Sequence, residues 1–226
     1  RKALDLYANV RPIRGEGVDV VIVRENTEGL YSGIEWTEPV RACTLRVVSR
    51  QGSERIARYA CTLAKSRRHL TVGNKANVLK SDCLFVDICT AEAVRAGVPC
   101  RTSYIDALCL DLLMHPDRYD VIVTTNMFGD ILSDAAAYLV GGLGMLPSAN
   151  IGDRHALFEP VHGSAPDIAG RNIANPVAAI RSAAMLLAHL GDPASAAAME
   201  AAVGRVLSAG IRTPDLGGDA GTREFG

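Results

Sequence analysis

The chain has 226 residues, 48% of them hydrophobic, which is enough apolar surface for one large or two modest packed domains. Its 24 Lys and Arg side chains are balanced by 25 Asp and Glu, so no net field favours nucleic acid or an anionic membrane as a partner. Any affinity for anionic ligands must therefore be local.

The cysteines and the apolar runs narrow the class further. Six cysteines are scattered with no C-x-x-C pair, which argues against a zinc ribbon and, in a chain this long, against a disulfide framework. No apolar run has the length of a membrane span, and the N-terminus lacks the h-region of a signal peptide. These observations predict a globular, soluble, cytoplasmic protein with reduced thiols.

Strands and helices alternate in the predicted order of elements. From the periodicity of apolar residues we expect a strand at 18–23, a strand at 45–48, a helix at 53–65, a strand at 69–72, a helix at 83–96, strands at 101–105 and 119–125, and helices at 175–190 and 193–209. A glycine-rich tail without regular structure follows. Polar candidates stand at the far ends of several strands, which is where open α/β sheets gather their ligand sites.

One segment, NMFGDILSD at 126–134, places two carboxylates four residues apart directly after a strand. Apolar residues at helical spacing predict that a helix begins there, so Asp130 and Asp134 share one face. Such oxygen ligands suit Mg²⁺ or Mn²⁺ that keeps part of its water and is shared with a chelating substrate. The alternative is that Asp130 only favours the helix N-terminus and Asp134 is solvated.

Four motifs in fixed order carry a family resemblance. They are RENTEGLYSG from Arg24, NKAN from Asn74, the segment 126–134, and EPVHGSAPDIAG from Glu159. Together they resemble the metal-dependent decarboxylating β-hydroxyacid dehydrogenases, which comprise isocitrate, homoisocitrate and 3-isopropylmalate dehydrogenases, with tartrate dehydrogenase a near relative. The resemblance runs from Arg1 to about Thr222. Compared with the family an N-terminal segment is absent, so we expect a fragment or a truncated reading frame with weak or absent turnover by itself.

The resemblance implies an α/β fold of the isopropylmalate dehydrogenase type, with two domains and a mixed sheet flanked by helices, distinct from a Rossmann fold and here lacking its N-terminal portion. Residues 9–140 are expected to form the central dimerisation and catalytic domain. Residues 1–8 and 141–226 are expected to form the remainder of the large cofactor-binding domain. The resemblance also implies a homodimer with shared active sites.

The implied reaction transfers hydride from the hydroxyl-bearing carbon of a 2-hydroxy acid to a nicotinamide, after which the β-carboxylate leaves as CO₂. A base and an acid are needed, and Lys75 and Tyr31 match the family residues that serve as these. The alternative is that Lys75 is a surface lysine and Tyr31 a half-buried strand aromatic.

The resemblance also assigns the substrate and metal ligands. Guanidinium groups offer a planar fork for carboxylates, and the family's substrate-binding arginines align with Arg1, Arg11 and Arg24. Its metal-binding aspartates align with Asp106, Asp130 and Asp134, and the one matching Asp106 comes from the partner subunit. Without the resemblance, Asp106 is explained as a helix cap after a strand.

A loop near the C-terminal third is implied to bind the cofactor. Its matching residues are His162, Gly163, Ser164, Ala165, Asp167 and Ile168, with Asn77, Glu159 and Asn175 nearby. A carboxylate at 167 accepts both hydroxyls of an adenosine ribose and repels a 2′-phosphate, so NAD is favoured over NADP. The glycines at 141–144 follow a helix and lack the strand–turn–helix setting of a dinucleotide fingerprint.

The resemblance also bears on the substrate. The sequence Glu-Asn-Thr-Glu-Gly after Arg24 looks more like that of the isocitrate and homoisocitrate dehydrogenases than that of the isopropylmalate dehydrogenases, so the resemblance favours homoisocitrate or isocitrate, and 3-isopropylmalate stays possible. A rival hypothesis is a non-catalytic regulatory or assembly subunit, in which one or more of the lysine, the tyrosine and the metal aspartates are usually lost. All of these residues are present here.

Overall fold

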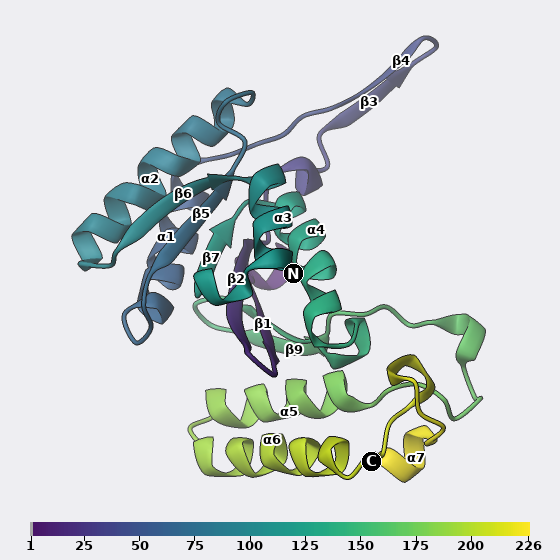
Figure 1. Ribbon diagram of the computed structural model, residues 1–226. Coiled ribbons are helices and arrows are strands. Elements are labelled where there is room, and N and C mark those ends of the chain that lie inside the picture. Colours follow the sequence, from purple (N-terminus) through teal and green to yellow (C-terminus); the bar gives the residue numbers. More distant parts are fainter. Residues whose placement is uncertain (1) are drawn as a thin grey trace.

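The computed structural model describes residues 2–226, and Arg1, a predicted substrate ligand, lies outside the described residues. A seven-stranded sheet forms the body, in the order β6-β5-β7-β2-β1-β8-β9 (Figure 1). Its strands are β1 (Ala8–Gly15), β2 (Val18–Glu25), β5 (Leu70–Asn74), β6 (Cys100–Tyr104), β7 (Val121–Thr124), β8 (Pro147–Ile151) and β9 (Ala156–Pro160). Strands β2, β7, β5 and β6 are parallel, whereas β1, β8 and β9 pair antiparallel with their neighbours. The predicted mixed α/β sheet is confirmed.

Helices cover both faces of this sheet (Figure 1). They are α1 (Arg50–Ala64), α2 (Lys80–Ala96), α3 (Ile105–Met114), α4 (Asn126–Ala136), α5 (Val177–His189), α6 (Pro193–Ser208) and the short α7 (Thr222–Phe225). Strand β2 shows why two layers form, because Val21 and Val23 pack in the core under α1 and α2, whereas Val20 and Ile22 pack under α3 and α4. Among residues 2–226 no helix is both long and apolar enough to cross a bilayer.

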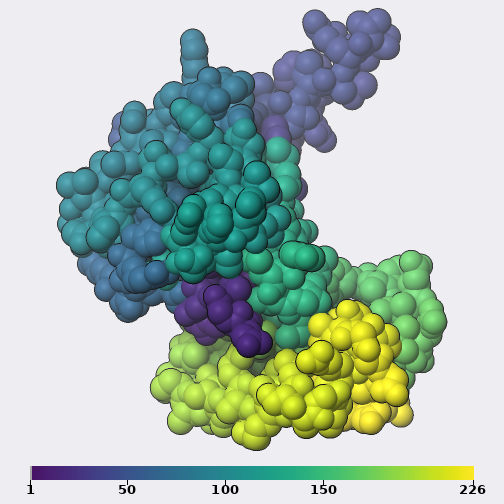
Figure 2. All heavy atoms as spheres, in the orientation of Figure 1, coloured from purple at the N-terminus to yellow at the C-terminus, as the bar shows by residue number. Residues whose placement is uncertain are grey.

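A two-stranded arm leaves the body between β2 and α1. Strands β3 (Glu35–Glu38) and β4 (Arg41–Thr44) pair only with each other, and the arm stands clear of the rest of the molecule in Figures 1 and 2. Its Trp36 is about half exposed and Val40 is 90% exposed. Apolar side chains on an arm without neighbours suggest a protein contact surface.

Several boundaries differ from the sequence-based expectation. The strand predicted at 45–48 is wrong, because this segment is a loop with a single bridge between Gly29 and Val47, and its burial does not alternate: Leu45 is exposed and the next three residues are half-buried. Helix α1 begins at Arg50, since Ser49 Oγ accepts from Gly52 N at 3.0 Å and caps it ahead of the predicted start at 53. The tail contains the unpredicted α7. The division into 9–140 and the remainder stays a prediction.

Asp120 ties the loop before β5 to the start of β7, and its charge should set part of the acid stability. Burial raises the pKa of this carboxyl, but hydrogen bonds from Arg68 N and Arg67 Nε more than offset it, so the pKa lies below its usual value. A depressed pKa stabilises the fold above about pH 4 and that contribution is lost as the pH falls through the folded-state pKa. We expect Asp120→Asn to lower the free energy of unfolding at pH 7 by about 2 kcal/mol.

The measurement is urea unfolding at several pH values, with Asp117→Asn as control because Asp117 is exposed and close in sequence. The loss caused by Asp120→Asn should shrink as the pH falls below about 4, because this carboxyl then binds a proton more readily in the unfolded chain than in the folded one. A loss that is constant from pH 7 to pH 3 would contradict the role given to the charge.

Candidate active site

Two buried arginines meet two aspartates where β1, β2 and α4 come together. Arg11 and Arg24 lie two residues from the apolar Ile13 and Ile22, on the α4-facing side of their strands, and are only 4% and 3% exposed. Helix α4 packs tightly here, since a Cβ on Gly129 would lie 2.6 Å from Cβ of Arg24. Glycine at this position therefore brings the next residue of the helix against both guanidinium groups.

The ion pairs confirm that the carboxylates of α4 share one face. Arg11 Nη2 lies 3.0 Å from Asp130 Oδ1, and Arg11 Nη1 lies 3.2 Å from Asp134 Oδ1. Arg24 also pairs with Asp130. Burial raises the pKa of Asp134; Arg11 counteracts the rise and the charge of Asp130 adds to it. Asp134 stays exposed, with 51% of its side chain accessible, but it pairs with Arg11, and Asp130 pairs with both arginines, so the two carboxylates do more than favour the helix N-terminus.

Tyr31 completes this cluster from the loop after β2. Its hydroxyl donates to Asp130 Oδ2 at 3.3 Å, and the Arg24 guanidinium carbon lies 5.5 Å from the centre of its ring. Arg24 Nε donates to Asn126 Oδ1 at 2.9 Å, which fixes the fork beside the first turn of α4. An open cavity of about 480 Å³ adjoins the cluster. It is lined by Lys2, Arg11, Arg24, Asn26, Tyr31, Asn126, Asp130 and Val161.

Lys75 and Asp106 form a second, separate pair at the ends of β5 and β6. Lys75 Nζ lies 2.7 Å from Asp106 Oδ1, and the hydrogen bond from the lysine lowers the pKa of this carboxyl. Within residues 2–226 no three Asp, Glu, His or Cys side chains are grouped to hold a metal. One chain therefore does not bring Asp106 together with Asp130 and Asp134, and Asp106 was assigned by the resemblance to the partner's site.

Sequence reasoning missed the side chains that hold the Lys75 loop. Asp82, which is fully buried, accepts from Lys75 N at 2.6 Å and pairs with Arg46 Nη2 at 2.5 Å. Arg46 also donates to Ser81 Oγ at 2.5 Å and to Thr125 Oγ1 at 3.0 Å, at the residue before α4. Arg46 thus connects the lysine loop to the aspartate helix. A solitary charge in a loop gives no sign of this role, because both partners are distant in sequence.

Removing Arg46 should leave the Asp82 carboxylate buried without its ion-pair partner. We expect Arg46→Met to lower the free energy of unfolding by about 3 kcal/mol, measured by urea denaturation. The control is Arg50→Met, because Arg50 is 71% exposed and its ion pair with Glu54 is long, at 3.8 Å. Such an exposed pair is expected to contribute less than about 0.5 kcal/mol to the free energy of unfolding. Equal effects of the two substitutions would show that the buried pair contributes no more to the free energy of unfolding than the exposed pair does.

The predicted cofactor loop lies on the surface after β9. His162, Gly163, Ser164, Ala165 and Asp167 are exposed and Ile168 is half-buried. Ala165 has a φ of 44°, a left-handed conformation unusual for a residue with a Cβ. A short 3₁₀ turn, Pro166–Ile168, follows it. The loop therefore has a defined backbone conformation and lies on the surface. The Asp167 carboxylate is exposed to solvent and forms no ion pair among the described residues.

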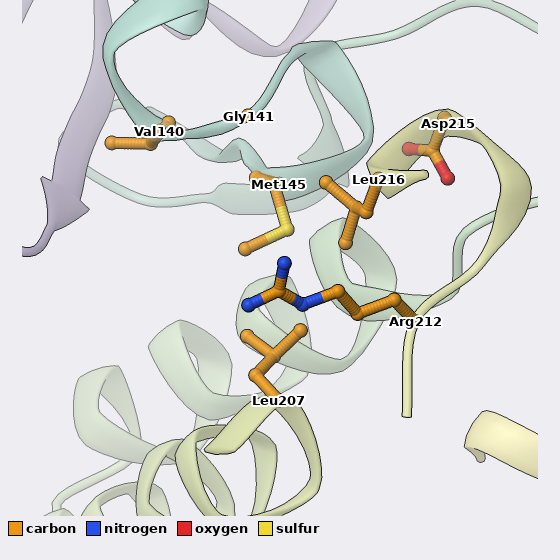
Figure 3. A pocket seen from close by; sticks show the side chains of 7 residues that line it. All are labelled: Val140, Gly141, Met145, Leu207, Arg212, Asp215 and Leu216. Carbon is orange, nitrogen blue, oxygen red and sulfur yellow. The ribbon is translucent and has the colours of Figure 1, made fainter. Parts of the chain in front are cut away.

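The remaining predicted cofactor residues are spread around this loop. Glu159 accepts from Asn150 Nδ2 at 2.9 Å on β8, and Asn77 is exposed in the Lys75 loop. Asn175 Nδ2 donates to Asp215 Oδ2 at 3.0 Å. Asp215 lines a cavity of about 430 Å³, in which the Arg212 side chain extends between Met145 and Leu207 (Figure 3).

The donor chemistry fits a hard divalent cation. Asp130 and Asp134 offer carboxylate oxygens on one face, and the two arginines beside them suit a substrate that brings its own carboxylates. Two carboxylates fill only part of an octahedral shell, so water and a substrate oxygen are required as well. For the cofactor, the exposed Asp167 is suited to a ribose diol.

Comparison with known proteins shows similarity to a family of dehydrogenases. The family described as isocitrate/isopropylmalate dehydrogenase matches residues 1–226. The isocitrate/homoisocitrate dehydrogenase of Thermus thermophilus is 53% identical over 238 residues, covering 100% of this chain and 71% of that protein. A mitochondrial regulatory subunit of the NAD isocitrate dehydrogenase of Dictyostelium discoideum is 45% identical over 241 residues, covering 100% and 68%.

A solved structure shows the same fold. The isocitrate dehydrogenase from Methylococcus capsulatus has a TM-score of 0.95 and 48% identity, covering 99% of this chain and 72% of that one. The enzymes of the matched family are decarboxylating dehydrogenases. The chain belongs to the isocitrate/isopropylmalate dehydrogenase family.

Proposed function

We propose that this protein catalyses NAD-dependent oxidative decarboxylation of a 2-hydroxy acid that carries a β-carboxylate, with homoisocitrate or isocitrate as the favoured substrate. The observation that carries the proposal is the meeting of Arg11 and Arg24 with Asp130, Asp134 and Tyr31 beside an open cavity. Two fixed guanidinium groups suit a substrate with several carboxylates, because each fork binds one of them bidentately.

Each side chain has a proposed task. Arg11 and Arg24 orient the substrate, with Arg1 as a third candidate. Asp130 and Asp134 hold Mg²⁺ or Mn²⁺, which when bound polarises the oxygen of the hydroxyl and later of the ketone. Tyr31 supplies a proton to the carbon that loses CO₂, and Lys75 accepts the hydroxyl proton through water. His162 to Ile168, with Asn77, Glu159 and Asn175, bind NAD.

The separation of the two pairs supports a homodimer with shared sites. Lys75 and Asp106 are bound to each other in one chain, and Asp106 is not grouped with Asp130 and Asp134 within residues 2–226, so in the proposed dimer each chain offers the lysine and this aspartate to its partner's site. Exposed apolar side chains support such a contact, on the arm at Trp36 and Val40 and on α3 and just after α4 at Met114 and Tyr138. A symmetric dimer would bury each of these patches twice.

The direct test is NADH formation from isocitrate, homoisocitrate and 3-isopropylmalate in turn. It is run on the 226-residue chain and on a form extended ahead of Arg1 with the N-terminal segment of the T. thermophilus relative. Turnover with one of these acids supports the proposal. The rival, a regulatory or assembly role, predicts metal and acid binding without turnover in either form, and a relative of that kind is known.

Cofactor choice gives a separate prediction. A 2′-phosphate placed against Asp167 should cost on the order of 1.4 kcal/mol or more, so we expect kcat/KM for NAD to exceed that for NADP at least about tenfold. Asp167→Asn should reduce this preference, whereas Asp219→Asn, which changes an exposed carboxylate elsewhere, should leave it unchanged. Equal efficiency with both cofactors would show that Asp167 does not face the ribose.

A further inference from the structure

Buried hydrogen bonds link the arginine–aspartate cluster to the strand before the proposed cofactor loop. Arg11 Nε donates to Asn9 Oδ1 at 2.7 Å, Asn9 Nδ2 donates to Asn150 Oδ1 at 3.0 Å, and Asn150 Nδ2 donates to Glu159 Oε1 at 2.9 Å. Both asparagines have no exposed surface, and they are direct partners in the pairing of β1 with β8. No step of the proposed reaction uses either amide.

Arg11 and Glu159, at the two ends of this series of hydrogen bonds, fix the direction in which every bond is donated. Arginine only donates and a carboxylate only accepts, so each amide has one orientation that satisfies both neighbours. Asn26 reinforces it, because its Nδ2 donates to Asn150 Oδ1 and to Leu6 O, each at 3.0 Å. The Oδ1 of Asn26 is left buried without a hydrogen-bond partner in the part of the chain that the structure describes. An unsatisfied buried acceptor destabilises the fold, so the orientation is kept against a local cost.

We propose that Asn9 and Asn150 are positioning residues that couple Arg11 to Glu159, so that binding of the acid beside Asp130 changes the affinity for NAD. A substrate carboxylate that binds Arg11 competes with Asp130 and Asp134 for the Arg11 guanidinium. It thereby moves the Nε–H group that donates a hydrogen bond to Asn9 Oδ1. When Asn9 moves with Arg11, the Nδ2 group that it donates to Asn150 moves as well. Asn150 in turn moves the Nδ2 group that it donates to Glu159. The coupling is reciprocal. The inference rests on the proposed function, which places the acid at Arg11 and NAD at Glu159.

The network itself is tested without any ligand. Water exchange of the Arg11 Nε–H is followed by ¹⁵N NMR in the 226-residue chain and in Asn150→Leu, which changes a residue linked to Arg11 through Asn9. We expect exchange to become at least about tenfold faster. Val10→Ala is the control, because Val10 is buried beside Asn9 in the sequence and belongs to the apolar core. Glu159→Ala, at a half-buried position, serves as the second variant if Asn150→Leu does not fold. Unchanged exchange in the folded variants overturns the proposal.

The consequence for ligands is tested by calorimetry. NAD is titrated into wild-type and Asn150→Leu protein, with and without saturating isocitrate and Mg²⁺. We expect isocitrate and Mg²⁺ to lower the Kd for NAD about fivefold or more in the wild type and to leave it unchanged in the variant. The same ratio in both proteins overturns the coupling. Absence of NAD binding to the wild type instead contradicts the proposed function, and the exchange measurement then decides the network independently.

Discussion

A Lys75→Ala chain and a Tyr31→Phe chain should each be nearly inactive as pure homodimers and should regain up to about a quarter of wild-type activity when refolded together. Under the proposal that Lys75 enters the partner's cluster, one site of the mixed dimer carries both lesions and the other carries neither. Random pairing makes about half of the dimers mixed, and half of their sites are intact. NADH formation is measured in the form extended ahead of Arg1, and native mass spectrometry counts the mixed dimers.

The control pairs Lys75→Ala with Lys75→Ala carrying an inert surface change, Asp87→Asn on α2, which should restore nothing. The separation of Lys75 and Asp106 from Asp130 in one chain is what makes restoration possible. Mixed dimers that form but stay inactive would place Lys75 and Tyr31 of the same chain in one site and remove the shared-site proposal.

Sequence predicts a buried strand when the residues of that strand are themselves apolar. Strand β2 is buried on both faces, and its nearly continuous apolar run is visible locally. Strand β1 escapes prediction because Arg11, Pro12 and Arg14 interrupt its pattern, although it is as buried as β2 up to Ile13. Arg11 is buried only because α4, more than a hundred residues later, brings carboxylates to it. Local periodicity contains no such information.

The site follows the same rule. The spacing of Asp130 and Asp134 predicts a shared helix face, and the structure confirms it through their common partner Arg11. The pairing of Arg46 with Asp82 and the amides of Asn9 and Asn150 were missed. These groups hold other functional residues without having functional chemistry themselves, and they connect segments far apart in sequence. Side chains that act directly have recognisable motifs, whereas those that position them are found only in the folded chain.

Metal removal should have the largest effect on turnover. We expect EDTA to lower activity by at least about a thousandfold, corresponding to about 4 kcal/mol, and Mg²⁺ or Mn²⁺ to restore it. The reason lies in the charges: Asp130 already accepts from Arg11, Arg24 and Tyr31, and carboxylates alone cannot polarise a ketone oxygen. Activity is followed as NADH formation, and EDTA previously saturated with Mg²⁺ is the control for effects of the chelator itself.

A substitution separates loss of the metal from damage to the fold. Asp134→Asn keeps the shape of the side chain but removes a charge, so we expect the Mg²⁺ concentration for half-maximal activity to rise at least about tenfold with unfolding free energy little changed. Asp87→Asn, exposed on α2, should leave that concentration unaltered. Burial raises the pKa of Asp134, so the wild-type requirement for Mg²⁺ should also increase as the pH falls towards that pKa, because protons and metal compete for the same oxygens. Full turnover in metal-free protein, or an Asp134→Asn variant with the wild-type requirement for Mg²⁺, would contradict metal binding. Asp130 and Asp134 would then act only as ion-pair partners of Arg11 and Arg24.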